Sequence, residues 1–464
     1  MPDTDQPRKA APLGSVSTPH LAARLGLFDA TMVVMGGIIG SGIFINPYVV
    51  AKLVHTPGLI LGAWLAGGVL ALIGAFIYAE LADRMPEVGG QYAYIRDAYH
   101  PLFGFLYGWA ELFVIGAGGT AAVAVTFARY FRELTQTRMG ETSLAIGAVL
   151  LLIVINFLGV RAGSGVQSLF MVLRIAGVAL VVACGAWFLS RSGAPRPAWH
   201  PLLDRPMSFG LLSVFGATMI PVLFAYGGWQ TANYIAGEIH EPRKNLPRAL
   251  LLGVLGVIVL YVSVNFIYVQ ALTPGGLAAT GTPASEVMRQ ALGSFGARLI
   301  AVAIAISTLG FLSQAVLTYP RLYFAMAQDR VLPRSFAWID PRTRVPMLAI
   351  ALQGAMTIAV IALGTFEQIL SYVVVMDWLF FGLTASCIFV FRARDRRATK
   401  ADLGYRVPWH PWTTGLFTAS AWLIVFNTIY KYPRNAGFAL CILSTGVPVY
   451  FLSQKLARPA RRIE

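Results

Sequence analysis

Apolar runs of about 20 residues, separated by short polar gaps, recur along the whole chain. A helix of this length spans the hydrocarbon core of a bilayer. The pattern therefore predicts an all-α polytopic membrane protein with twelve transmembrane helices. The predicted spans are roughly 26–50, 58–84, 98–131, 142–160, 164–190, 208–236, 246–272, 294–328, 346–364, 366–391, 411–430 and 435–455.

The first span contains a stretch, Gly36 to Phe44, that reads Gly-Gly-Ile-Ile-Gly-Ser-Gly-Ile-Phe. Each Gly in a helix interior costs roughly 1 kcal/mol relative to Ala, so this density of Gly predicts a broken helix. The flanking residues are too apolar for a solvent-exposed loop. Irregular backbone at membrane depth is tolerated only where it packs in protein or lines a cavity. The stretch is therefore the first candidate for a binding site.

A second stretch of the same kind, Phe224 to Trp229, lies in the sixth predicted span. Each break then falls in the first span of a block of five, about 25–190 and 208–391. Because five is odd, the second block inserts upside-down relative to the first. This arrangement is typical of inverted-repeat transporters, whose site lies near the midplane between two broken helices. For either break alone, close helix packing through small residues remains an alternative.

The polar segments predict the remaining organisation and the orientation. Residues 1–24 are expected to form a disordered cytoplasmic tail without a secretory signal, 25–391 the transport core, and 411–464 two peripheral helices and a C-terminal tail. Residues 392–410 form a basic loop. Its cations are Arg392, Arg394, Arg396, Arg397, Lys400 and Arg406. The excess of Lys and Arg on this side predicts cytoplasmic termini in the cell (inner) membrane.

Composition and charge exclude several other classes. The chain is 57% hydrophobic and 12% charged, and its net charge of +15 lies in the gaps between apolar runs. That location indicates topology and anionic lipid as the cause rather than nucleic acid. The 3 Cys lie in apolar runs and the 6 His in tails, loops or span ends. Without a Walker A loop, nucleophile elbow or metal motif, we expect no enzyme, metal or cofactor. Nothing indicates the polar ring or filter of a channel.

Three charged residues lie inside predicted spans. Arg174 must pair or contact carbonyls at that depth, and it cannot titrate because a guanidinium holds its proton. Glu111 and Asp377 have three open alternatives: a counter-ion for Arg174, helix packing, or proton uptake during transport. Glu80, nearer the predicted cytoplasmic end, is expected at the surface or at a gate.

Several segments resemble the amino acid–polyamine–organocation superfamily, in particular the L-type amino acid transporter branch and its bacterial relatives. They are Gly36–Phe44, Phe224–Trp229, Tyr78–Leu81 with Pro86–Tyr94, Glu238–Leu250 and Leu317–Arg321. The resemblance implies a LeuT-type fold, with a ten-helix core and two peripheral helices. It also implies that the backbone N–H groups of Ser41, Gly42 and Ile43 bind a substrate carboxylate. The implied acceptors for the substrate ammonium are the carbonyls of Ile39, Phe224, Ala225 and Gly227.

Elementary electrostatics supports such a site. A half-helix N-terminus carries partial positive charge and unpaired donors. Two antiparallel broken helices can therefore hold a zwitterion without burying a charged side chain, which costs at least ~2.5–3.5 kcal/mol at the bilayer centre. The aromatic residues Phe224, Tyr226 and Trp229 are gate candidates, with plain aromatic packing as the alternative. The resemblance further implies that Arg174 stands where the family often has Lys, as a brace against the first break.

We therefore expect a secondary transporter that moves an α-amino acid, neutral in side chain, by alternating access as an exchanger or proton symporter. A carrier of polyamines or other amines is the alternative, and a membrane-embedded enzyme or channel is the second alternative. The expected partners are the substrate, protons and the lipid bilayer. Neither nucleic acid nor an obligatory partner subunit is expected. Sodium binding by Ser307, Thr308, Ser313 and Gln314 is disfavoured by a fixed Arg174 and by hydroxyl bonding to the helix's own carbonyls.

Overall fold

The computed structural model describes most of the chain. The described residues are 25–85, 90–157, 164–191, 197–230, 232–233, 239–328, 331–332, 334–338, 340, 346–398 and 404–457. The predicted tail 1–24, Pro86–Gly89, Glu238, Lys400 and the final residues 458–464 lie outside them. So do the side chains of Arg397 and of Gln314, Leu317, Thr318, Pro320 and Arg321.

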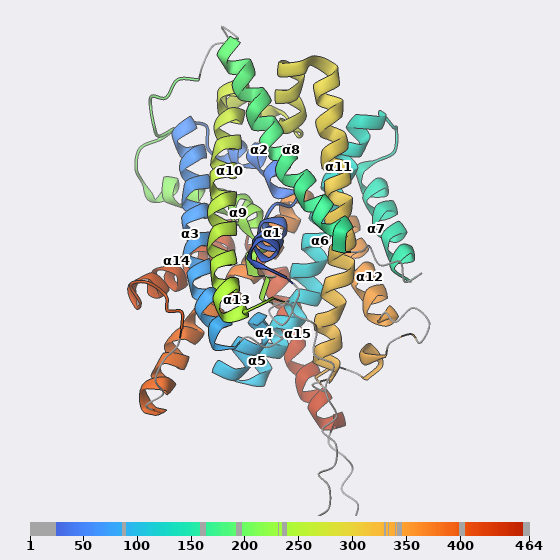
Figure 1. Ribbon diagram of the computed structural model, residues 1–464, viewed down its shortest axis with the longest axis vertical. Helices are drawn as coiled ribbons and strands as arrows, with labels where there is room; N and C mark the ends of the chain where they lie inside the picture. Colours follow the sequence, from blue (N-terminus) through green and yellow to red (C-terminus); the bar gives the residue numbers. More distant parts are fainter. Residues whose placement is uncertain are drawn as a thin grey trace, which may run out of the picture.

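Helices make up the structure, and the longest of them run along the long axis of the molecule (Figure 1). Their bounds are α1 Leu27–Ile38, α2 Gly42–Leu53, α3 Pro57–Arg84, α4 Gly90–Ala98, α5 Pro101–Ala110, the π-helix η1 Glu111–Ile115, α6 Gly116–Thr135, α7 Glu141–Phe157, α8 Ser164–Arg191, α9 Phe209–Tyr226, α10 Pro242–Ala279, α11 Pro283–Gln328, the 3₁₀ turn η3 Arg334–Ala337, α12 Met347–Leu363, α13 Phe366–Ala398, α14 Trp412–Lys431 and α15 Pro433–Ala457.

Each predicted span coincides with helix. Among the described residues, 8 helices are long and apolar enough to cross a membrane, and the bent pair α1 and α2 makes up to 9. The helices α7 and α12 are apolar but shorter. The all-α polytopic prediction is confirmed at this level, whereas the full set of twelve spans stays a prediction.

Three local features differ from the sequence prediction. The helix α4 was not predicted, because its nine residues are too polar to read as a span. A π-helical segment, η1, interrupts the third predicted span between α5 and α6. The helix α13 continues past the predicted end of its span to Ala398, so Arg392 and Arg394 are helical rather than part of a loop.

The first predicted break is observed, and it is narrower than the Gly-rich stretch. Helix α1 ends at Ile38 and α2 begins at Gly42, with a bend of 40° between them. Gly36 and Gly37 remain in the last turn of α1. The second break follows Tyr226, where α9 ends and Gly228 takes a positive φ of 100°.

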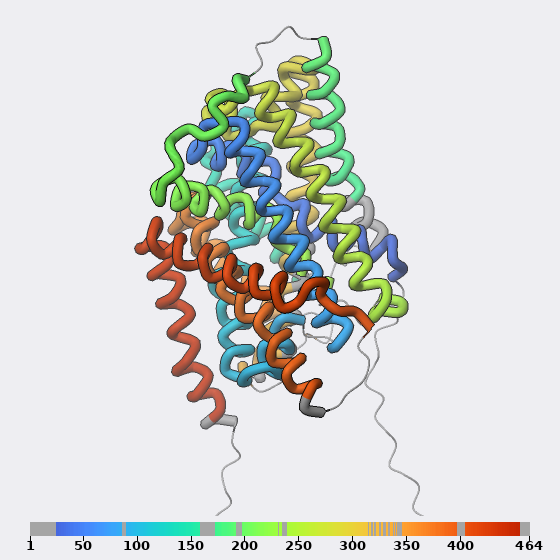
Figure 2. Tube along the Cα trace, turned by 90° about the vertical axis from the view of Figure 1, so that its left-hand side faces the viewer, coloured from blue at the N-terminus to red at the C-terminus, as the bar shows by residue number. Residues whose placement is uncertain are grey.

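The broken helices lie inside the bundle. Helix α1 packs on α10 and α8, and α2 packs on α9, α10 and α11. Figure 1 shows α1 at the centre of the view with longer helices around it. The last two helices, α14 and α15, pack on α13 and lie on the outside, with α14 crossing the flank of the bundle (Figure 2).

A buried ionic cluster ties the end of α3 to α13 and to the segment before α14. The Glu80 carboxylate, which is 0% exposed, accepts hydrogen bonds from Arg392 at 2.6 and 3.0 Å and from Arg84 at 2.8 and 3.0 Å. It also accepts one from the backbone N–H of Val407 at 2.8 Å. Glu80 is thus neither at the surface nor in the central cavity described below, but it joins three segments.

We expect Glu80→Gln to destabilise the protein, because the amide cannot balance the two buried guanidinium groups. Removing one partner of a buried ion pair costs about 3–5 kcal/mol. The check is the unfolding midpoint in detergent of this variant beside Glu241→Gln, whose parent side chain forms only an exposed pair with Lys244. Equal midpoints for the two variants would contradict the role given to Glu80.

Candidate functional site

The two helix breaks touch each other through glycine. A Cβ at Gly42 would lie 2.6 Å from Ala225 Cα, which real Cβ atoms do not do. A Cβ at Gly228 would overlap the carbonyl of Gly37, and the positive φ of Gly228 disfavours other residues independently. Only glycine at these two positions lets the α1–α2 break lie directly against the α9 break.

The first break presents free hydrogen-bond donors. Ser41, Gly42 and Ile43 stand at the start of α2, where backbone N–H groups have no partner within the helix. Within the described residues, no hydrogen bond is recorded from these three amides. Together with the partial positive charge of a helix N-terminus, they form a site suited to an anion.

The carbonyl ends of α1 and α9 face the same region. The hydroxyl of Tyr261, on α10, lies 3.0 Å from the carbonyl oxygen of Ile38 and 3.3 Å from that of Ala225, so it links the two breaks. The carbonyl of Phe224 accepts from the N–H of Gly227 at 3.2 Å. The oxygens of Ala225 and Phe224 each keep a second lone pair for a ligand, whereas that of Ile38 also accepts from the N–H of Gly40 at 2.7 Å.

Arg174 contacts the last turn of α1, next to the first break, and its role as a brace stays a prediction. It is 2% exposed on α8, and its Nη1 donates to the carbonyl of Gly36 at 2.8 Å. Its guanidinium also lies over the ring of Phe311, 5.5 Å from the centroid. A cation at this point complements the negative C-terminal end of α1.

The pairing of Arg174 with Glu111 or Asp377, one of the three alternatives left open by the sequence, is not seen among the described residues. In the described part of the chain, no ion pair joins Arg174 to an acidic side chain. Both carboxyls instead face the space between the breaks. Arg174 therefore acts on the backbone of α1 from one side, while the two acids lie on the other.

A cavity of about 120 Å³ occupies that space. A single buried water needs roughly 10–15 Å³ on the same measure, so the cavity has room for a small solute. It is lined by backbone and side chains from both breaks and from α6, α11 and α13. The lining residues are Gly37, Ile38, Gly40, Ser41, Gly42, Glu111, Ile115, Gly119, Val123, Phe224, Ala225, Gly227, Gly228, Gln230, Phe311, Ala315, Tyr319, Val373 and Asp377.

Most of the predicted binding residues line this cavity. Ser41, Gly42, Phe224, Ala225 and Gly227 all do so. The side-chain oxygen of Ser41 is buried and has no hydrogen-bond partner among the described residues. The cavity thus contains an unused polar group at the start of α2.

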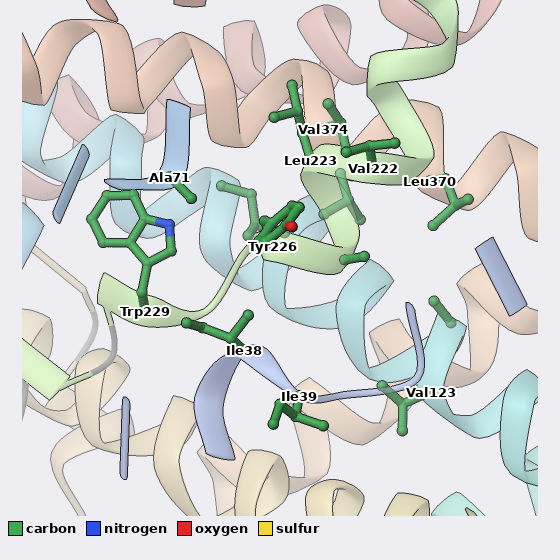
Figure 3. Packing of buried hydrophobic residues seen from close by; sticks show 14 of the residues in the cluster. Ile38, Ile39, Ala71, Val123, Val222, Leu223, Tyr226, Trp229, Leu370 and Val374 are labelled. Atoms are coloured by element: carbon green, nitrogen blue, oxygen red, sulfur yellow. The ribbon is translucent and has the colours of Figure 1, made fainter. Parts of the chain in front are cut away.

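Two other predicted positions have buried side chains that do not line the cavity. Ile39 and Ile43 are both fully buried in the apolar core. Figure 3 shows Ile39 in the stretch that follows Ile38, near Val123. Any contribution of these two residues to ligand binding therefore comes from their backbone groups.

Of the three aromatic gate candidates, only Phe224 lines the cavity. The ring of Tyr226 packs against those of Trp64 and Tyr261. The ring of Trp229 packs against that of Tyr78, with the two ring centroids 4.6 Å apart. Figure 3 shows Tyr226 and Trp229 as separate rings above Ile38. In this conformation, Tyr226 and Trp229 pack against other aromatic rings and do not lie at the cavity, which agrees with the packing alternative.

The side-chain wall of the cavity was missed at the sequence level. It consists mainly of small or apolar residues on α6, α11 and α13, such as Gly119, Val123, Ala315 and Val373. Apolar residues inside apolar spans carry no local signal, because only the packing of distant helices brings them together. Glu111 and Asp377, charged residues inside spans, were the two signals that pointed to these walls.

Of the hydroxyls considered for sodium, that of Thr308 behaves as an ordinary helix hydroxyl. Thr308 is buried and donates to the carbonyl of Ile304 at 2.8 Å, within its own helix. This is the local bonding expected for Thr in a membrane helix.

Comparison with known proteins gives consistent matches over nearly the whole chain. A family model described as amino acid permease matches residues 25–450. The serine/threonine exchanger SteT of Bacillus subtilis is 30% identical over 439 residues, covering 94% of this chain and 98% of the relative. The human large neutral amino acids transporter small subunit 2 is 31% identical, with 93% and 80% covered. The human Asc-type amino acid transporter 1 is 29% identical, with 93% and 82% covered.

The contact between the breaks predicts that Gly228→Ala destabilises the protein, because the new methyl group overlaps the Gly37 carbonyl. Overpacking of this kind costs about 1–3 kcal/mol. The matched control is Gly62→Ala on α3, where an added Cβ meets nothing within 4 Å. Thermal unfolding of both purified variants checks this. If the two variants unfold alike, the breaks are not in tight contact.

Proposed function

The chain belongs to the amino acid permease family, and on this premise we propose that it is a secondary transporter of small neutral α-amino acids. The family and the relatives are amino acid transporters and not enzymes. The resemblance stated from the sequence is thereby confirmed, and amino acid transport across a membrane follows from it. The substrate class, the site and the mechanism are our proposals.

The observation that supports the site is the meeting of free donors and carbonyl acceptors around one cavity. A substrate α-carboxylate would accept hydrogen bonds from the N–H groups of Ser41, Gly42 and Ile43, with the Ser41 hydroxyl as a further donor. The α-ammonium would donate to carbonyls at Ile39, Phe224, Ala225 and Gly227. Backbone groups that are already at membrane depth bind both ends of the zwitterion without another buried charge.

The volume of the cavity favours a short side chain. With about 120 Å³ for the whole ligand, there is little room beyond the amino acid head group. Gly119 leaves space on the α6 wall, since an added Cβ there meets nothing within 4 Å. The relatives divide on this point, as one is named for serine and threonine and another for large neutral amino acids. The small cavity favours the first kind of substrate.

Alternating access would use the inverted repeat of five and five spans, beginning with α1 and α9. The two broken helices support this arrangement, as does the agreement of each predicted span with helix. We place the chain in the cell membrane with both termini in the cytoplasm, supported by the distribution of basic residues. Transport would occur as exchange or proton symport. We propose that it works without a second subunit, although one relative is named as the small subunit of a large neutral amino acids transporter.

A carrier of polyamines is the second candidate, and the carboxyls of Glu111 and Asp377 in the cavity favour it. Such a substrate has no carboxylate, so the three free amides of α2 would have no ligand. The substrate panel below separates the two candidates.

Uptake into proteoliposomes tests the proposal. The purified chain should accumulate labelled L-serine or L-alanine saturably and stereoselectively, and polyamines should not compete. Internal amino acid should accelerate uptake if the carrier is an exchanger, and an inward proton gradient should do so if it is a symporter. If no amino acid in a broad panel is taken up above protein-free vesicles, or if polyamines alone are, the proposed function is wrong.

A further inference from the structure

We propose that Glu111 and Asp377 form a subsite that selects substrates whose side chain carries a hydrogen-bond donor, a hydroxyl or a short amine. The inference rests on the proposed function, since it names the side-chain specificity of the same cavity. Its starting point is that two carboxyls from different helices line one small cavity. Glu111 comes from η1 and Asp377 from the middle of α13.

The two carboxyls have no protein partner among the residues that the structure describes. In the described part of the chain, no hydrogen bond or ion pair is recorded for either side chain, although Glu111 is only 5% exposed. Among the cavity-lining residues there is no Lys, Arg or His. Arg174 bonds the Gly36 carbonyl instead, and it does not line the cavity. Glu111 is thus a buried acid without a partner, which is unfavourable unless a ligand or a proton completes it, whereas Asp377 is half-buried.

The position of Glu111 is set by the irregular backbone around it. Glu111 is the first residue of the π-helical segment, and its carbonyl accepts from the N–H of Gly116 five residues on. A Cβ at Gly116 would lie 2.8 Å from that carbonyl oxygen and 3.3 Å from the ring of Tyr319 on α11. Single π-helical turns are rare and recur at functional sites. Here the turn places an acid at the wall of the cavity.

A second polar group in the cavity points independently to a ligand. Ser41 is 1% exposed and lines the same cavity. Its side-chain oxygen has no hydrogen-bond partner among the described residues. Ser41 belongs to the predicted head-group site, whereas the two acids come from α13 and from η1 at the start of α6. A ligand that satisfies all three therefore needs an anionic end near α2 and a donor elsewhere.

The remaining lining restricts what that donor can be. Ile115, Val123, Ala315 and Val373 surround the acids with apolar surface. In such surroundings a side chain with a hydroxyl or ammonium gains a hydrogen bond that an aliphatic side chain of equal size cannot make. A site built to bond a donor also discriminates strongly against an analogue lacking it, because its own polar groups are left unpaired. The cavity volume of about 120 Å³ limits the side chain to a few atoms.

The test compares isosteric pairs as competitors for uptake by the full chain in proteoliposomes. L-Threonine should compete at least about 10-fold better than its isostere L-valine, because a hydrogen bond to a charged group contributes about this much to binding. For the same reason, L-2,3-diaminopropionate should compete at least about 10-fold better than L-2-aminobutyrate. In Glu111→Gln and Asp377→Asn both ratios should fall towards one. The matched control is Glu286→Gln, an exposed acid on α11 paired with Arg289, in which the ratios should stay as in the parent chain.

The outcomes separate this inference from the proposed function. Saturable uptake with equal ratios in the parent chain overturns the subsite and leaves the transporter intact. Ratios that are unchanged in both variants, with loss of the response to a proton gradient, also overturn it and assign the acids to proton coupling. If a variant does not fold, the test uses the parent chain alone. Threonine should then raise its unfolding temperature more than valine does, and an equal rise would overturn the subsite. Failure of uptake for every amino acid instead contradicts the proposed function.

Discussion

The direct contact between two broken helices is the constraint on which the rest of the structure depends. Gly42 lies against Ala225 and Gly228 against Gly37, so neither break can move away or gain a side chain without disturbing the other. Free helix ends at membrane depth are unfavourable unless they find partners. The protein supplies some of these partners itself, through Tyr261 and Arg174, and leaves others open to a cavity. The open groups are the ones that a zwitterion can bind.

The positive and negative side chains near this contact lie in different places. Arg174 donates to the Gly36 carbonyl of α1 from outside the cavity, while Glu111 and Asp377 line the cavity. Among the described residues, no Lys, Arg or His lines the cavity. Far from the cavity, the buried Glu80 cluster joins α3 to α13, which carries Asp377 at its middle. The ionic cluster and the cavity wall thus share one helix.

The parts predicted from the sequence are those with a strong local signal. Four Gly within seven positions of an apolar run predicted the first break, and Gly227 with Gly228 predicted the second. Apolar length likewise predicted the helices. The fold of α4 and the π-helical turn at Glu111 were missed, because one is short and polar and the other depends on Gly116 meeting α11. The roles of Tyr226 and Trp229 could not be predicted, because they depend on neighbouring residues that come from distant helices.

The central claim is that backbone groups at the two breaks hold both ends of an amino acid head group. The most direct measurement is binding to the purified protein of L-serine, of L-serinamide and of the hydroxy acid that lacks the α-amine. The account predicts that serine binds and that loss of either charged end weakens binding at least about 10-fold, the effect of a hydrogen bond to a charged group. Equal binding of serinamide, or of the deaminated acid, would contradict it.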